Sequence, residues 1–186
     1  MQIAADLKKV EALFSNFKRG QHSLDSRIAW LRDADSRADR AIARWSSEIQ
    51  RRDAGTKPEF EFSANGRPYK DADKERLAAV FATAMKRAVE RRSEDTFQRA
   101  ELVPVGSYRG FEIQVSCERQ KIHFTVTGRD SYEPDNLVYR VDDKFSISGF
   151  ISRLDNFLER LEGWRDEAES TRGRELSAVS YTHLTL

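Results

Sequence analysis

The sequence predicts an α+β protein: a small antiparallel sheet with a covering helix, inserted at the tip of a long antiparallel coiled-coil helix pair. Two observations predict this class. Apolar residues recur with a 3-4 spacing near both ends of the chain, which is typical of coiled-coil helices. Between them, short segments alternate apolar and polar residues, as half-buried antiparallel strands do. We expect a coiled-coil helix over 1–53, an α+β unit over 54–146, a returning helix over 147–177 and a separate tail over 178–186.

Composition limits the class of protein. The chain has 186 residues, with 32 Lys and Arg against 31 Asp and Glu, and a single cysteine. A net charge of +1 argues against a general polyanion binder. One cysteine excludes an internal disulfide and favours a reducing compartment, and no apolar run is long enough to cross a bilayer. We therefore expect a cytoplasmic chain that has no membrane partner.

The first helix carries a heptad stripe that is interrupted only at Gln21 and Asp35. Its apolar members are Ile3, Leu7, Val10, Phe14, Phe17, Leu24, Ile28, Leu31, Ala38, Ile42, Trp45 and Ile49. The helix should end near Asp53-Ala54-Gly55, because glycine terminates helices and Pro58 cannot continue one. No capping residue precedes Ile3, so we expect Met1 to be an internal residue of a longer protein.

The central segment begins with a hairpin and a helix. Glu59 to Phe62 alternates, and Asn65-Gly66 is typical of a tight turn before Arg67 to Lys70. Asp71 or Asp73 can then cap a helix that ends near Arg92. The inner face of that helix consists of Leu77, Val80, Phe81, Ala84, Met85 and Ala88.

Strands follow the helix. One predicted strand places Phe111, Ile113, Val115 and Cys117 on its dry face, and the next places Ile122, Phe124 and Val126 there. Polar residues alternate with both sets, which predicts antiparallel pairing with one solvated face. Leu137 to Val141 is a further predicted strand.

The last helix should start at Ser146 or Ser148. Its apolar side consists of Ile147, Phe150, Ile151, Leu154, Phe157, Leu158, Leu161 and Trp164. Residues 1–53 hold 11 basic and 8 acidic side chains, whereas 147–177 hold 5 and 7, so opposite charge favours pairing of the two helices. At 1.5 Å per residue they would run roughly 75 and 45 Å. The shorter helix would end opposite about residue 22, and we expect self-association through the uncovered Leu7, Val10, Phe14 and Phe17.

Residues that could carry catalysis are few. The sequence has no phosphate-binding glycine loop, no Cys/His metal cluster and no Gly-x-Ser-x-Gly turn. We therefore predict no catalytic residue, no metal site and no cofactor. Cys117 continues the dry face of its strand, which favours a buried structural thiol, and Asp142-Asp143 precedes a helix start, where carboxylates favour capping.

Two basic groups could contact nucleic acid. Lys86, Arg87, Arg91 and Arg92 lie on the central helix, and Tyr108, Arg109, Arg119 and Lys121 are expected on the wet side of the sheet. Aromatic and basic side chains on a sheet can stack bases and hold phosphates. The alternative is a charge-balanced solvated face, because Glu90, Glu112 and Glu118 are interleaved with these residues.

One segment resembles a known family. Gly106-Ser107-Tyr108-Arg109-Gly110-Phe111-Glu112-Ile113 is similar to a recurring Gly-x-Tyr-x-Gly-Phe-x-aliphatic signature. The same order of features surrounds it: Asp25 to Ile28, the Gly66 to Tyr69 hairpin, Thr127-Gly128, and Ser152 to Leu158. Together they resemble the C-terminal region of very large bacterial helicase–DNA methyltransferase proteins carried by plasmids, phages and integrative elements. One departure is Glu75-Arg76, where that family tends to have a small Ala-Gly pair.

The resemblance implies a role without catalysis. In that family the SWI/SNF-type helicase core and the adenine-specific methyltransferase core lie outside this region. It therefore implies an accessory fragment that positions DNA or other domains of the same polypeptide. The alternative is a coiled-coil protein-interaction module without DNA contact.

The C-terminal tail has a different character from the helix before it. Val179 to Leu186 reads Val-Ser-Tyr-Thr-His-Leu-Thr-Leu, which resembles one reading-frame translation of the mosaic-end adapter used in transposase-based sequencing libraries. We expect this tail to be adapter-derived and the natural gene to continue beyond about Ser177.

Overall fold

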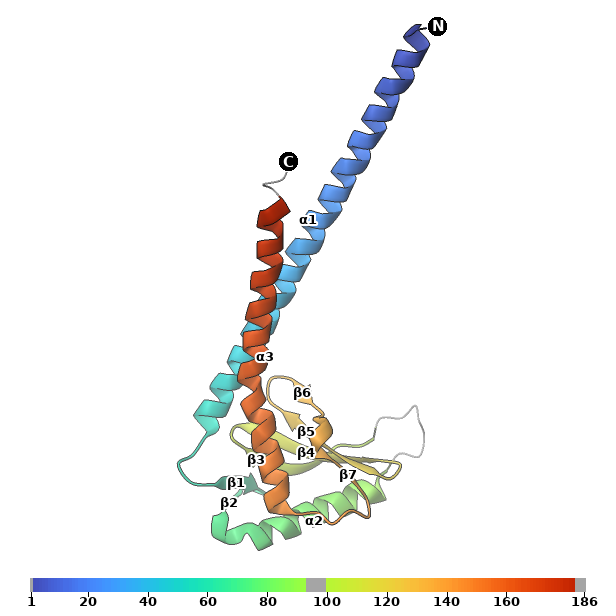
Figure 1. Cartoon of the computed structure of the whole chain (residues 1–186). Coiled ribbons are helices and arrows are strands. Elements are labelled where there is room, and N and C mark those ends of the chain that lie inside the picture. Colours follow the sequence, from blue (N-terminus) through green and yellow to red (C-terminus); the bar gives the residue numbers. More distant parts are fainter. Residues whose placement is uncertain (1, 93–99, 183–186) are drawn as a thin grey trace. The chain divides into compact units, whose positions relative to one another are not determined.

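The computed structural model describes residues 2–92 and 100–182 (Figure 1). Long α-helices and an antiparallel sheet make up these residues, which confirms the α+β class. The chain divides into two compact units, each described by itself. Residues 44–165 form the sheet unit, and residues 1–43 with 166–186 form the helix unit. None of the helices within the described residues is long and apolar enough to span a membrane.

Helix α1 runs from Gln2 to Gly55, close to the predicted range. Gly55 ends it where the backbone of another segment passes, since a Cβ on Gly55 would lie 2.3 Å from the carbonyl carbon of Arg109. The hydroxyl of Thr56 donates to the carbonyl oxygen of Arg52 at 2.7 Å, which satisfies one carbonyl of the last turn.

The predicted hairpin and central helix are present. Strands β1 (Glu61–Ala64) and β2 (Arg67–Lys70) pair antiparallel around Asn65 and Gly66, both of which have positive φ, as a tight two-residue hairpin turn requires. A short 3-10 turn, η1 (Asp71–Asp73), leads into α2 (Lys74–Glu90). The carboxylate of Asp73 accepts the backbone N–H of Lys70.

The sheet continues with β3 (Val103–Tyr108), β4 (Phe111–Glu118), β5 (Lys121–Thr127), β6 (Ser131–Tyr132) and, after the 3-10 turn η2 (Asp135–Leu137), β7 (Val138–Arg140). The strand order is β2-β1-β3-β4-β5-β6, and β7 also pairs with β5. Every pairing is antiparallel. Alternation predicted β4 and β5, whereas β3 and the two-residue β6 were not recognised as strands.

Helix α3 runs from Ile147 to Thr182. Ser146 caps its start, because the Ser146 hydroxyl accepts the N–H of Gly149 and its carbonyl accepts the N–H of Phe150. The helix continues past the expected junction near Ser177. The origin of the tail after residue 177 stays a prediction.

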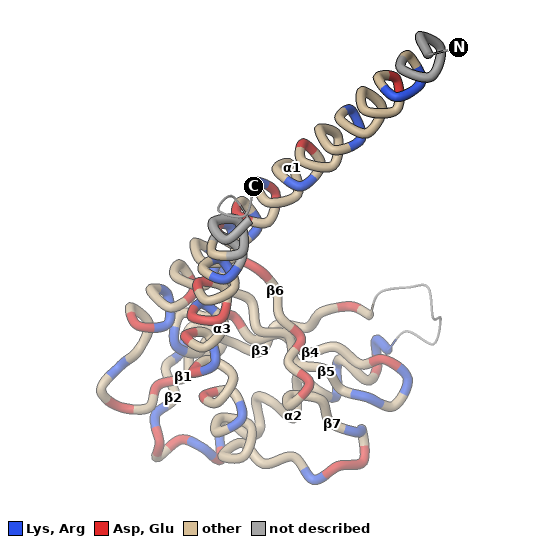
Figure 2. Tube along the Cα trace, turned by 45° about the horizontal axis from the view of Figure 1, so that its top comes forward, with Lys and Arg blue, Asp and Glu red and all other residues tan. Residues whose placement is uncertain are grey.

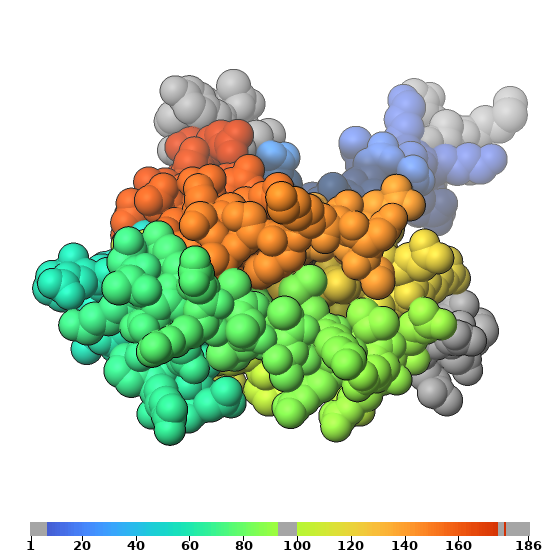
Figure 3. All heavy atoms as spheres, turned by 90° about the horizontal axis from the view of Figure 1, so that it is seen from below, coloured from blue at the N-terminus to red at the C-terminus, as the bar shows by residue number. Residues whose placement is uncertain are grey.

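The core of the sheet unit lies on the dry face of β3, β4 and β5, and two helices cover it. Phe81 of α2, Phe124 of β5 and Phe150 of α3 are fully buried, with ring centroids 4.6 to 5.8 Å apart. Figure 3 shows α2 (green) and the start of α3 (orange) side by side at the surface of the sheet unit. The single predicted covering helix is therefore joined by the first turns of α3.

In the helix unit, α1 and α3 contact each other over a limited length. Arg172 of α3 forms ion pairs with Asp35 at 2.9 Å and Asp39 at 3.0 Å, and Ala34 and Ala38 are buried. Asp35, which interrupts the heptad stripe in the sequence, is therefore part of an ion pair between the helices. The apolar positions nearer the N-terminus, from Leu7 to Ile28, stay exposed.

Candidate functional site

The four sheet residues predicted to bind nucleic acid lie at opposite ends of β4. Tyr108 and Arg109 precede β4, whereas Arg119 and Lys121 follow it. An extended strand of this length separates the two ends by roughly 25 Å. The sheet therefore divides the predicted set.

Tyr108 lies in the core and not on the wet face, which corrects the prediction. Only 7% of its surface is exposed, and its ring packs against Phe60 and Phe62. Its hydroxyl donates to the carboxylate of Asp155 at 3.0 Å. Burial, followed by the nearby Asp155 charge, raises the pKa of Tyr108 well above its usual range. The ring is unavailable for stacking on a base.

A register shift explains this placement. The pairing of β3 with β4 slips by one residue between Pro104 and Gly106, so one extra residue enters the strand. Val103 and Val105 point inward, and after the shift Tyr108 also points inward. Simple alternation would have placed Tyr108 on the opposite face.

Arg109 is held beside Tyr108 by the turn that follows β3. Arg109 and Gly110 both have positive φ, which is the requirement of a two-residue hairpin turn. The Arg109 guanidinium donates to the same Asp155 oxygen at 3.0 Å. The Asp155 carboxylate of α3 therefore accepts hydrogen bonds from both Tyr108 and Arg109, which attaches this turn to α3.

The glycines of the same segment permit close backbone approaches. A Cβ on Gly106 would lie 2.2 Å from the Ser63 carbonyl oxygen, and one on Gly110 would lie 2.8 Å from the Arg51 carbonyl oxygen. The Gly-x-Tyr-x-Gly-Phe pattern thus has a packing explanation. Tyr108 and Arg109 on one side and Asp155 on the other bring together two of the segments that carry the family resemblance.

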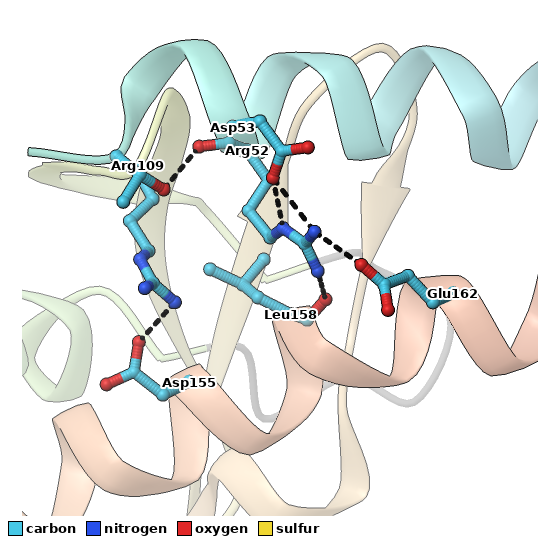
Figure 4. A network of polar contacts seen from close by, with 7 residues as sticks. Arg52, Asp53, Arg109, Asp155, Leu158 and Glu162 are labelled. Carbon is cyan, nitrogen blue, oxygen red and sulfur yellow. Dashed lines mark hydrogen bonds and ion pairs between the residues drawn. The ribbon is translucent and has the colours of Figure 1, made fainter.

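A second set of polar contacts lies next to this junction (Figure 4). Arg52 of α1 donates to Asp53 at 2.9 Å, to the carbonyl oxygen of Leu158 at 3.3 Å and to Glu162 at 2.7 Å. A hollow of about 400 Å³ is lined by Arg52, Asp53, Thr56, Arg109, Glu159 and Glu162. Its three carboxylates outnumber its two guanidinium groups, so it is poorly suited to a phosphate. Its contacts fix α1 to α3.

Glu48 is an anchor that sequence reasoning missed. Its side chain has no exposed surface, and one carboxylate oxygen accepts the N–H groups of Arg129 and Asp130 and the hydroxyl of Tyr132. Gly128 lies directly against it. A lone glutamate on a heptad helix carries no signal for such a role, because surface glutamates are common on these helices.

Some of the other predicted basic residues lie near one end of the sheet. Arg91 and Arg92 directly follow α2, and the charge of Arg92 acts on the thiol of Cys117 near the end of β4. The same thiol lies 3.8 Å from the Arg119 carbonyl oxygen in the β4–β5 turn.

Lys121, at the start of β5, pairs across the strands with Arg140 of β7. The sequence did not single out Arg140. We call Arg91, Arg92, Arg119, Lys121 and Arg140 the basic edge; Figure 2 shows Lys and Arg gathered at this end of the sheet, with acidic positions between them.

Carboxylates partly balance the basic edge. Arg91 pairs with Glu101 at 2.5 Å and Arg140 lies 3.9 Å from Asp142, while Glu118 is the cross-strand neighbour of Lys121. Lys86 and Arg87 lie four and three residues before the last residue of α2, Glu90, and Lys86 is 4.0 Å from Glu90. The edge can attract phosphates, but only through a modest excess of positive charge.

Cys117 is buried, as its place in the strand predicted. Burial raises the pKa of its thiol, and the charge of Arg92 only partly opposes this shift. Among the residues that the structure describes, no three His, Cys, Asp or Glu side chains gather in a way that could hold a metal ion.

Comparisons of this chain with protein-family models, with curated proteins and with solved structures give no match. The function is therefore inferred from the sequence pattern and from the contacts and charges of the chain itself.

Proposed function

We propose that this chain is a non-catalytic accessory fragment from the C-terminal region of a large bacterial helicase–DNA methyltransferase, and that it positions DNA or other domains of the same polypeptide. The observation that carries the DNA role is the basic edge. Arg91 and Arg92, Arg119 and Lys121, and Arg140 come from three separate segments and meet at one end of the sheet. The helicase–methyltransferase part of the proposal is supported by the sequence resemblance, and the Tyr108–Asp155 contact joins two of the segments that carry it.

The architecture proposed with this function is an α+β unit at the tip of an antiparallel coiled-coil pair. Within the sheet unit, Trp45 packs against Trp164 and Arg52 reaches Leu158, so α1 and α3 run in opposite directions there. Within the helix unit, Arg172 bridges α3 to α1. The heptad spacing of α1 supports continuous pairing from the sheet unit as far as the buried Ala38 and Ala34.

Binding at the basic edge would use the phosphate backbone. Guanidinium and ammonium groups attract phosphates without reading sequence. The neighbouring carboxylates limit the net attraction, so we expect weak binding that falls steeply with salt.

Fluorescence anisotropy with a labelled DNA duplex tests this role. The paired change Arg119→Glu with Lys121→Glu should weaken binding at least about tenfold at low salt and reduce the slope of log K against log salt by about 2. The matched control, Lys57→Glu with Arg67→Glu, makes the same charge change at exposed positions outside the basic edge. Absence of wild-type binding at low salt, or an equal loss in the control, would contradict DNA contact at this edge.

A second function is favoured by a different observation. The exposed apolar side chains of α1 between Leu7 and Ile28 suit a coiled-coil protein-interaction module that makes no DNA contact. Pairing of this stripe with another chain would then be the activity, and sedimentation tests it as described below.

A further inference from the structure

The N-terminal half of α1 exposes a row of large apolar side chains that is interrupted only at Gln21. Leu7 is 61% exposed, Phe14 59% and Phe17 68%, and Val10, Leu24 and Ile28 continue the row. Isolated exposed apolar residues are ordinary, whereas a contiguous row marks an interaction surface.

The row occupies the a and d positions of a heptad. Leu7, Phe14, Gln21 and Ile28 are spaced by seven residues and form the a positions, and Val10, Phe17, Leu24 and Leu31 form the d positions. The same face is covered farther along, because Ala34 and Ala38 are buried and Arg172 of α3 pairs with Asp35. The exposed row is thus the uncovered part of a helix-pairing face.

We propose that a second copy of this chain covers the row, and that residues 7–32 of the two copies form an antiparallel coiled coil. Each a position would face a d position of the second copy: Val10 against Ile28, Phe14 against Leu24, and Phe17 against Gln21, with the symmetric contacts repeated. Leu7 would meet the half-buried Leu31 at each end. The inference goes beyond the accessory role and does not depend on it, while it gives the pairing function a partner, a polarity and a register.

Charge complementarity selects this arrangement. The e positions beside the seam, Glu11, Lys18, Asp25 and Arg32, alternate in sign and are all exposed. In the proposed register Glu11 faces Arg32 of the second copy and Lys18 faces its Asp25, so four interhelical pairs are attractive. Side chains tilt toward the N-terminus of their own helix, so antiparallel e side chains offset in this way lean toward one another. The Lys18 ammonium already lies over the seam, 4.8 Å from the centre of the Phe14 ring.

The alternative arrangements are disfavoured by the same charges. A parallel dimer pairs g with e positions, which brings Arg27 against Arg32 and leaves Lys18 opposite Leu13 and Asp25 opposite Gly20. Shifting the antiparallel register by one heptad brings Lys18 against Lys18 and Glu11 against Asp25. Both arrangements lack an attractive pair among these positions.

Sedimentation equilibrium of the full chain tests partner and polarity together. Wild type should dimerise with concentration, and Phe14→Glu should abolish the dimer. Lys18→Glu should raise the dissociation constant about tenfold, because two attractive pairs become repulsive. Lys18→Glu with Asp25→Lys restores opposite signs and should return the constant to within about twofold of wild type. Lys9→Glu makes the same charge change at an exposed position outside the seam and should have little effect.

Spin-label distances fix the register. Labels at Gly20→Cys should lie near the two-fold axis and close together, and a side chain there meets open space. Labels at Lys9→Cys should be separated by about 30 Å along the axis. A parallel dimer gives short distances at both sites. A register shifted by two heptads, in which Glu11 faces Lys18, gives about 24 Å at Gly20 and a short distance at Lys9. The buried Cys117 should remain unlabelled, and labelling of wild type checks this.

Each outcome is decisive for the inference. A chain that stays monomeric at all concentrations overturns it and points to a different segment or protein as the occupant. A dimer that Lys18→Glu with Asp25→Lys fails to rescue, or that has short Lys9 distances, overturns the register. Neither result alters the DNA measurement, so failure of this inference and failure of the accessory role can be told apart.

Discussion

Glu48 shows how much of this fold depends on single polar side chains. A buried carboxylate is costly unless donors surround it, and here two backbone N–H groups and the Tyr132 hydroxyl bind one of its oxygens. The Arg51 guanidinium lies 3.5 Å from the other oxygen. The carboxylate thereby holds the β5–β6 turn against α1.

Gly128→Ala should therefore destabilise the protein. The added Cβ would lie 2.3 Å from the second Glu48 oxygen and 2.8 Å from the Phe111 ring, so both neighbours must move. We expect a loss of about 1–3 kcal/mol in the free energy of unfolding, measured by urea denaturation.

Gly163→Ala is the matched control for Gly128→Ala. It lies within α3, a Cβ there meets nothing within 4 Å, and alanine favours helix by up to about 1 kcal/mol. Unchanged stability in Gly128→Ala would mean that Glu48 does not approach the turn this closely.

At the scale of elements, the sequence predicted what regular patterns can encode. Alternation located β4 and β5, and Asn65-Gly66 located the first hairpin. The pattern failed at β3, because the register shift near Gly106 changes which residues point inward. Tyr108 was assigned to the wrong face because β3 was not recognised as a strand, whereas Lys121 does occupy an exposed strand position.

The joining of elements was less predictable than the elements themselves. The Asp155 contacts with Tyr108 and Arg109 join residues more than forty positions apart, and no local pattern indicates such a pairing. The basic edge has the same origin, since only the fold brings Arg92 and the β4–β5 turn at Arg119 both to the Cys117 thiol.

Asp155→Ala should weaken the attachment of the β3–β4 turn to α3. It leaves the buried Tyr108 hydroxyl without its acceptor, which costs about 1–3 kcal/mol in the free energy of unfolding. Tyr108→Phe should cost about 1 kcal/mol, and the double variant should cost less than the sum of the two, because the pair is lost only once.

Glu167→Ala is the control for the Asp155 variants, since Glu167 is an exposed acid on the same helix. It should change the free energy of unfolding by less than about 0.5 kcal/mol. Equal effects of Asp155→Ala and Glu167→Ala in chemical denaturation would show that Asp155 makes no stabilising contact.

At the scale of the whole molecule, the two units differ in how well their backbone amides are protected from exchange with solvent. The sheet unit encloses an aromatic core of fully buried side chains such as Phe81 and Phe124. The N-terminal part of the helix unit has exposed apolar residues and depends on its own helix hydrogen bonds. Isolated helices are marginally stable in water, so the units should open independently.

Hydrogen exchange measures this difference. At concentrations low enough to keep the chain monomeric, amides between Leu7 and Ile28 should exchange through local opening. Amides of Ile113 and Val115 in β4 should exchange only with opening of the sheet unit, several orders of magnitude more slowly. Equal protection in both regions would contradict independent opening of the units.

The burial of Cys117 has one further consequence. The only thiol of the chain lies on the inward face of β4, with no exposed surface. A reagent in solution can reach the sulfur only when the structure around the end of β4 opens. The rate at which Cys117 reacts with a thiol reagent therefore measures how often the structure around this residue opens.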